Sequence, residues 1–216
     1  MQGESRMLIN HEDIESMPHL YRVAFINSLS GFKSANLVGT ADKKGLTNLS
    51  IVSSCTHIGA HPPLVAMIIR PHSVERHTLE NILATSFYTL NQVHAGIYRP
   101  SHQTSARYPK EVSEFAAVGL TEAWRQDFAA PYVKESKISL GMALREHHHL
   151  SINGTELLIG EIMQVQLPSE CLSQDGFVDI EKAETVALSG LDSYHRSQRL
   201  ARLSYAKPDA PLSEIE

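Results

Sequence analysis

The sequence predicts a mostly β protein, a barrel or a sandwich with a few short helices. Segments of strand character recur along the 216 residues, whereas long helical patterns are rare. The regular alternation of strands and helices that marks a doubly wound fold is missing. Neither a G-x-G-x-x-G motif nor a G-x-x-x-x-G-K-[ST] motif occurs, so a nucleotide ligand would have to be held in another way.

The first part of the chain opens with a helix signal and continues with strands. Asn10 can cap a short helix that runs to about residue 14. Runs rich in apolar and β-branched residues follow, and we expect strands at residues 21–25, 35–41, 46–54 and 64–69. The polar residues at 42–45 predict a hairpin turn, and a His-Pro-Pro breaker at 61–63 precedes the last of these strands.

The rest of the chain alternates between clear elements and polar connections. Residues 73–83 carry apolar positions at helical spacing, and residues 86–91 predict another strand. Residues 94–113 are polar and irregular, which is typical of a functional or disordered loop. A strand is expected at 156–167, where Gly160 indicates a bend or the close approach of another backbone.

Composition excludes several classes of protein. Hydrophobic residues make up 42% and charged residues 20%, which is ordinary for a globular domain. The net charge of −5 disfavours a general nucleic-acid or membrane-surface binder. Cys55 and Cys171 form no C-x-x-C motif, the N-terminus lacks an apolar leader, and no run approaches a membrane span, so we expect a cytoplasmic protein.

The order and spacing of several short motifs carry a resemblance. Thr47-Asn48-Leu49-Ser50 comes first, followed by Ser53, Pro62-Pro63-Leu64-Val65, Arg70 and residues 77–82. The series continues at 104–108, 112–115, 157–161, 190–194 and 202–208. From about residue 20 to its end, the chain resembles the flavin-reductase-like family, whose members include flavoredoxins and NAD(P)H:flavin oxidoreductases.

That resemblance implies a fold, a cofactor and a site. The implied fold is a six-stranded, Greek-key-like split β-barrel that binds FMN, with an N-terminal extension at 1–19 and a single domain at 20–216. FMN would lie in a groove at a homodimer interface. The implied cofactor-binding residues are Thr47, Asn48, Leu49, Ser50, Ser53, Ser54, Cys55, Arg70, Ser73, Thr78, Thr104 and Ser105.

The resemblance also assigns parts of the cofactor to parts of this set. Residues 48–54 would line the isoalloxazine ring, and residues 104–107 would close over it. Arg70, Ser73 and Thr78 would contact the phosphate, which suits the charge-assisted bonds of a guanidinium and the directed bonds of hydroxyl groups.

Two functions remain open from these residues. One is an NAD(P)H-dependent flavin reductase that passes a hydride to flavin N5 and supplies an oxygenase. The other is a flavoredoxin-like electron carrier that does not oxidise NAD(P)H itself. Hydride transfer needs no protein acid or base, so we name no catalytic side chain. Many family members that use pyridine nucleotides carry a His before the strand at 157–161, where this chain has Thr155.

Simpler structural roles compete with these assignments. Arg70 could pair with a carboxylate, Ser73 could cap a helix, and Cys55 is better read as a small buried hydrophobe than as a nucleophile. Twelve histidines raise the weaker possibility of a metal-dependent hydrolase. We predict no metal site, because alternation along a strand would let at most two of the triplet at 147–149 face the same way. A solvated strand or a pH-sensitive interface suits that triplet better.

Overall fold

The centre of the protein is an antiparallel sheet of seven strands, seen in a computed structural model that describes residues 6–71 and 76–215. Across the sheet the strand order is β3-β2-β6-β9-β10-β5-β4, which is one strand more than the six that the resemblance implied. The strands are β2 (Asn36–Ala41), β3 (Thr47–Val52), β4 (Cys55–Ala60), β5 (Pro63–Ile69), β6 (Phe87–Gln92), β9 (Ser139–Leu150) and β10 (Thr155–Gln166).

The sheet closes on itself through a very short connection. β3 and β4 lie at opposite edges of the strand order, yet only Ser53 and Ser54 separate them in the chain. The Ser54 hydroxyl donates a hydrogen bond of 2.6 Å to the carbonyl of Ile68 on β5, which fixes this connection beside the neighbouring strand. Two residues span only about 7 Å, so the sheet must curl until its edges approach, which makes a barrel that is split at this seam.

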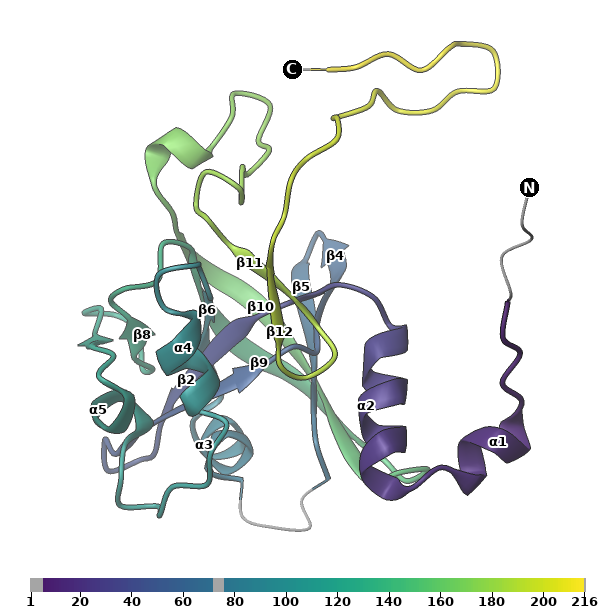
Figure 1. The fold of residues 1–216 in the computed structure, drawn as a ribbon. Coiled ribbons are helices and arrows are strands. Elements are labelled where there is room, and N and C mark those ends of the chain that lie inside the picture. The colour runs from purple at the N-terminus through teal and green to yellow at the C-terminus, as the bar shows by residue number, and fades with distance from the viewer. Residues whose placement is uncertain (1–5, 72–75, 216) are drawn as a thin grey trace.

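Smaller elements surround the barrel. β1 (Lys33–Ser34), β11 (Val186–Ser189) and β12 (Ser193–Arg196) form a three-stranded sheet, and β7 (Glu122–Ala123) pairs with β8 (Tyr132–Val133). The helices are α1 (His11–Ser16), α2 (His19–Leu29), α3 (His77–Thr85), α4 (Tyr98–Gln103) and α5 (Glu114–Val118), with a 3-10 turn at Ser169–Cys171. In Figure 1, α3, α4 and α5 lie against the strands, whereas α1 and the C-terminal tail extend away from them. Among the described residues no helix is long and apolar enough to cross a membrane.

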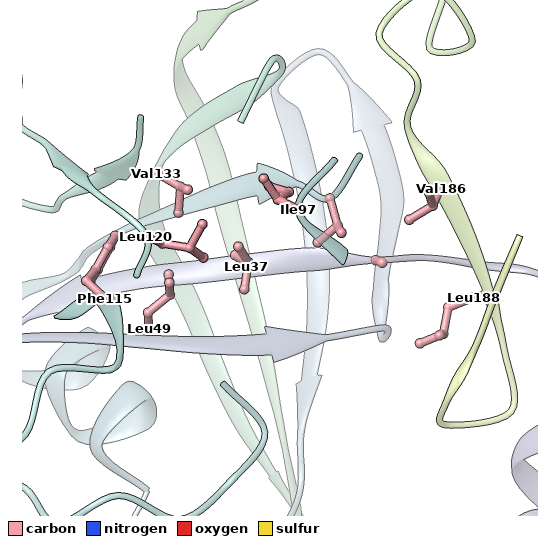
Figure 2. Packing of buried hydrophobic residues seen from close by; sticks show 10 residues of the cluster. Leu37, Leu49, Ile97, Phe115, Leu120, Val133, Val186 and Leu188 are labelled. Atoms are coloured by element: carbon pink, nitrogen blue, oxygen red, sulfur yellow. The ribbon is translucent and has the colours of Figure 1, made fainter. Parts of the chain in front are cut away.

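Alternation along the strands sorts their side chains between two apolar clusters. Leu37 and Leu49 belong to the first cluster, where they meet Phe115 of α5 between the strands and the covering segments (Figure 2). Val38, the neighbour of Leu37, belongs instead to the second cluster, which fills the barrel around Tyr88. Because neighbours on a strand point to opposite faces, burial of Leu49 turns the side chains on either side of it away from the first cluster.

Gly160 allows the second cluster to close. A Cβ at this position would overlap the Tyr88 hydroxyl, and the pairing of β10 with β9 shifts register between Ile159 and Gly160. The group that approaches this glycine is thus a side chain and not the backbone expected from the sequence, and the register shift marks an irregularity of the strand here.

Most of the strands expected from the sequence are confirmed, with three kinds of exception. The strand expected at 21–25 is wrong, because these residues belong to α2, which begins after Pro18 and buries none of its side chains. The irregular stretch at 94–113 contains α4, and β4, β7, β8, β11 and β12 are strands that the pattern did not reveal. β9 was anticipated only at the histidine triplet 147–149. The helix expected at 73–83 is α3, whose described part begins at His77.

Candidate cofactor site

A cavity of about 850 Å³ lies beside the barrel seam. Its wall comes from β3 and the 53–54 connection, the end of β5, α3, the 104–110 segment and the β11–β12 sheet. This volume falls within the range of small-molecule and cofactor sites. The seam therefore brings together segments that lie far apart in the sequence.

The cavity gathers most of the residues expected at a cofactor site. The predicted residues that line it are Asn48, Ser50, Ser53, Ser54, Arg70, Thr78, Thr104 and Ser105. Thr47, Leu49 and Cys55 lie next to lining residues but are not among them. Ser73 lies outside the described residues.

A buried hydroxyl connects β3 to α3 at the cavity wall. The Thr78 hydroxyl accepts a hydrogen bond of 2.8 Å from the Asn48 side-chain amide. It also shares a hydrogen bond of 2.8 Å with the Ser50 hydroxyl. Asn48 and Thr78 are buried, so these bonds orient polar groups that would otherwise lack partners.

The two other residues of the 47–50 motif secure the opposite side of the same strand. The backbone N–H of Leu49 donates a hydrogen bond of 2.9 Å to the buried Glu114 carboxylate. The Thr47 hydroxyl bonds Ser113, at 2.7 Å, and donates to Glu122, at 2.6 Å. These contacts hold the start of α5 against the free edge of β3, while Asn48 and Ser50 remain available to the cavity.

Glu114 is a buried carboxyl group that sequence reasoning did not select, and it also lines the cavity. Burial raises its pKa, and the Leu49 hydrogen bond only partly offsets this effect. Its place just after Ser113 at the start of a helix resembles an ordinary first-turn acid, so local sequence carried no signal of its burial.

Four cationic side chains line the cavity, and the three arginines among them lie near one another. Arg70, Arg76, Arg107 and Lys110 all line it. Burial lowers the pKa of Arg76, and the nearby positive charges of Arg70 and Arg107 lower it further. Among the described residues none of the three arginines forms an ion pair, whereas Lys110 lies 3.5 Å from Glu80. Of these cations, sequence reasoning selected Arg70 alone.

A second polar group comes from α4 and the small sheet. His102 Nδ1 and the Tyr194 hydroxyl are hydrogen-bonded at 3.0 Å, and both residues line the cavity. Burial and then the Asp192 charge raise the pKa of Tyr194 to about 12, so the phenol keeps its proton at neutral pH. Thr155 lines the same cavity, so the residue that stands in place of the expected His does face this site.

The remaining candidates have structural surroundings. Burial raises the pKa of the Cys55 thiol to about 12, which makes it a poor nucleophile. His147 and His149 both bond the buried Glu156 carboxylate, at 2.7 and 2.8 Å, so two members of the triplet share a face of β9. Within residues 6–71 and 76–215, no cluster of His, Cys, Asp and Glu side chains has the arrangement of a metal site.

These groups suit a flavin mononucleotide. The guanidinium groups, which have no carboxylate partner in the described part of the chain, match a phosphate dianion. The hydroxyl and amide groups of β3 provide directed bonds along a flat ring. Leu188, Ile68 and Val52 add apolar surface to the same cavity. The residues present therefore fit the cofactor that the motifs imply.

Comparison with known proteins supports this interpretation. Residues 29–182 match the model of the flavin reductase like domain. A protein from Shewanella frigidimarina NCIMB 400, whose crystal structure is named as that of a flavin reductase with a split barrel domain, is 54% identical in sequence to this chain. The two structures superpose with a TM-score of 0.90. The match covers 93% of this chain and 100% of that one.

Two more distant structures share the fold. Nitrilotriacetate monooxygenase component B from Bacillus cereus is 18% identical, with a TM-score of 0.80 over 90% of this chain and 97% of its own. An NADH:FAD oxidoreductase from Streptomyces globisporus C-1027 is 15% identical, with a TM-score of 0.67 over 90% of this chain and 99% of its own. The chain is mostly β, folds as a split barrel and belongs to the flavin reductase like family of oxidoreductases.

Proposed function

We propose that this chain binds FMN in the cavity at the barrel seam and reduces flavin with NADH or NADPH as the electron donor. The observation that carries the proposal is that arginines forming no ion pair within residues 6–71 and 76–215 meet the Asn48–Thr78–Ser50 network in a single cavity. Positive charge at one end and directed polar groups along a strand match the two unlike parts of the cofactor.

Each part of the site would have its own task. Arg70 and Thr78 would hold the phosphate, together with Ser73, and the 104–105 segment would cover the ligand. The 48–54 segment would lie along the ring. Bound flavin supplies the redox chemistry, and the chain contributes binding, orientation and exclusion of water.

Homodimerisation is part of the proposal. Large apolar side chains are exposed on α2 and the C-terminal tail, including Leu20, Leu29, Leu203 and Tyr205. A second copy covering these surfaces would remove them from water. The Bacillus cereus structure is named as a monooxygenase component, which supports an oxygenase as the protein that would receive reduced flavin.

A flavoredoxin-like carrier is the second candidate, and Thr155 favours it. A threonine lines the cavity where many members that use pyridine nucleotides carry a His. A carrier would hold FMN equally well but would exchange electrons with protein partners and not with NADH or NADPH.

Anaerobic mixing of the FMN-loaded protein with NADH, and separately with NADPH, distinguishes the two functions. We expect loss of the visible flavin absorption with one donor at least. Absence of bleaching with either donor, in a protein that holds FMN, would refute the reductase and leave the carrier.

Replacement of Arg70 tests the binding site itself. Because the guanidinium would contact only the phosphate, Arg70→Gln should weaken FMN binding by about tenfold or more and leave riboflavin binding unchanged. Equal effects on FMN and riboflavin would place the phosphate elsewhere.

A further inference from the structure

The hairpin that joins β9 to β10 carries a cluster of three titratable side chains. Glu156 of β10 is buried, and each oxygen of its carboxylate is hydrogen-bonded to one imidazole, His147 Nε2 at 2.7 Å and His149 Nδ1 at 2.8 Å. The side chains of the two histidines are 31% and 59% exposed. Protons from solvent can therefore reach both bases, although the acid that they share is buried.

The remaining charged groups of the neighbouring strands do not face Glu156. β5 pairs with β10 on the side away from β9, and its residues Pro63–Ile69 include no titratable group. His72 and Glu75, which follow β5, lie outside the described residues. The other charged side chains of β9 and β10 pair among themselves, His148 with Glu146 at 2.7 Å and Arg145 with Glu161 at 2.6 Å.

Protonation of the imidazoles changes both the charge of this cluster and the strength of its bonds. Hydrogen bonds from His149 and then from His147 lower the pKa of Glu156, so its carboxylate stays ionised while imidazoles titrate. A charged imidazole bonds a carboxylate more strongly than a neutral one does. The cluster should therefore hold the hairpin more tightly as the pH falls from about 8 to about 6.

The same hairpin forms part of the cavity wall. Thr155 lines the cavity and directly precedes Glu156, so the two side chains point to opposite faces of β10. Glu156 pairs with the last residue of β5, directly before Arg70. In the turn, Gly154 lies against Pro71, since a Cβ on this glycine would be 3.5 Å from Pro71 Cβ. A change in the hold on Glu156 is therefore transmitted to the segment that carries Arg70.

We propose, resting on the function proposed above, that His147, Glu156 and His149 form a pH-sensitive latch that tightens the Arg70 end of the cavity as the pH falls. A tighter wall lowers the cost of ordering the site around a ligand. The positive charge added to the latch also favours an anionic ligand. FMN affinity is therefore higher at about pH 6 than at about pH 8, by a factor that depends on the two histidines.

The double variant His147→Gln/His149→Gln tests the coupling, because glutamine keeps a hydrogen-bond donor but cannot be charged. Quenching of flavin fluorescence gives FMN affinity at about pH 6 and about pH 8. We expect the ratio of the two affinities to be about threefold larger in wild type than in the double variant. Titration of the FMN phosphate is common to both proteins and cancels in this comparison.

His148→Gln is the matched control. It removes a histidine of the same triplet that bonds Glu146 and not Glu156, so the wild-type ratio should be retained. Equal ratios in wild type and the double variant would overturn the proposal, and so would a ratio in His148→Gln as low as that of the double variant.

Hydrogen exchange of the amides at 150–155 reports on the latch without a ligand. Wild type and the double variant are compared at the same pH, so the intrinsic pH dependence of exchange cancels. We expect wild type to be better protected at about pH 6, with a smaller difference at about pH 8, and equal differences at both would refute the latch. Wild-type protein that takes up FMN at neither pH would refute the proposed function instead, while exchange would still decide whether the latch exists.

Discussion

Replacement of Thr78 by valine removes one hydroxyl and both of the hydrogen bonds that join β3 to α3. The shape of the side chain is nearly conserved, so the change acts on Asn48 and Ser50 with little effect on packing. Each bond contributes about 0.5–1.5 kcal/mol, which places the expected loss of unfolding free energy at about 1–3 kcal/mol. The loss falls toward the lower end if water reaches Ser50, which is only half-buried.

The effect on the cofactor should exceed the effect on the fold alone. Without Thr78, the Asn48 amide and the Ser50 hydroxyl are free to rotate in the cavity, and a predicted phosphate donor is lost. We expect the dissociation constant of FMN to rise by roughly tenfold.

Urea denaturation gives the unfolding free energy, and quenching of flavin fluorescence gives the affinity. Thr78→Ser keeps the hydroxyl and should retain most of both. Thr85→Val, on the same helix but outside the cavity, is the matched control, because its hydroxyl bonds backbone atoms of Asn81 and Phe87 at the end of α3. A Thr78→Val protein with unchanged stability and unchanged FMN affinity would refute the argument.

Three further changes test packing and charge. Gly160→Ala should destabilise by about 1–3 kcal/mol in urea denaturation, and adding Tyr88→Phe should restore part of the loss because the hydroxyl that meets the new Cβ is removed. Burial raises the pKa of Glu114, so the unfolding free energy of the wild type falls as pH rises above 4.5. The unfolding free energy of Glu114→Gln relative to wild type should therefore increase as pH rises above 4.5. A difference between the two proteins that does not depend on pH would contradict this. Hydrogen bonds from His149 and His147 lower the pKa of Glu156, so its contribution is present above pH 4.5 and lost below. Thermal unfolding should therefore show Glu156→Gln to be less stable at neutral pH, with the gap closing in acid.

The success of sequence reasoning about the fold followed the strength of local signals. β5 was visible because it is a short apolar run that follows a His-Pro-Pro breaker, and β6 because it begins with two aromatic residues and a threonine. The turn at 42–45 has the composition that a hairpin needs. Apart from the triplet at 147–149, β9 was hidden because its first half is buried and its second half carries exposed charged residues and histidines, so no single periodicity runs through it. α2 was read as a strand because a short apolar run, with no buried face, suits either state.

Sequence motifs identified some residues of the cavity and missed others. Asn48, Arg70 and Thr78 were accessible because they lie in motifs with family-like spacing. Arg107 and Tyr194 lie in the motifs at 104–108 and 190–194 but were not singled out as cofactor-binding residues. Arg76 and His102 lie outside the motifs and line the cavity only once the chain has folded, so no local pattern distinguishes them from ordinary surface positions.

In the 47–50 motif, strand periodicity distinguishes the side chains that face the cavity from those that face the core. The resemblance assigned all four residues to the cofactor, but adjacent side chains on a strand point to opposite faces. Once Leu49 is seen to be the most apolar of the four, it must face the core, and Asn48 and Ser50 must share the other face. The structure has this arrangement: Asn48 and Ser50 line the cavity and meet at Thr78, while Leu49 packs in the first cluster and presents its N–H to Glu114. A motif of four residues thus performs two tasks, and the side that anchors α5 keeps the other side in place for the ligand.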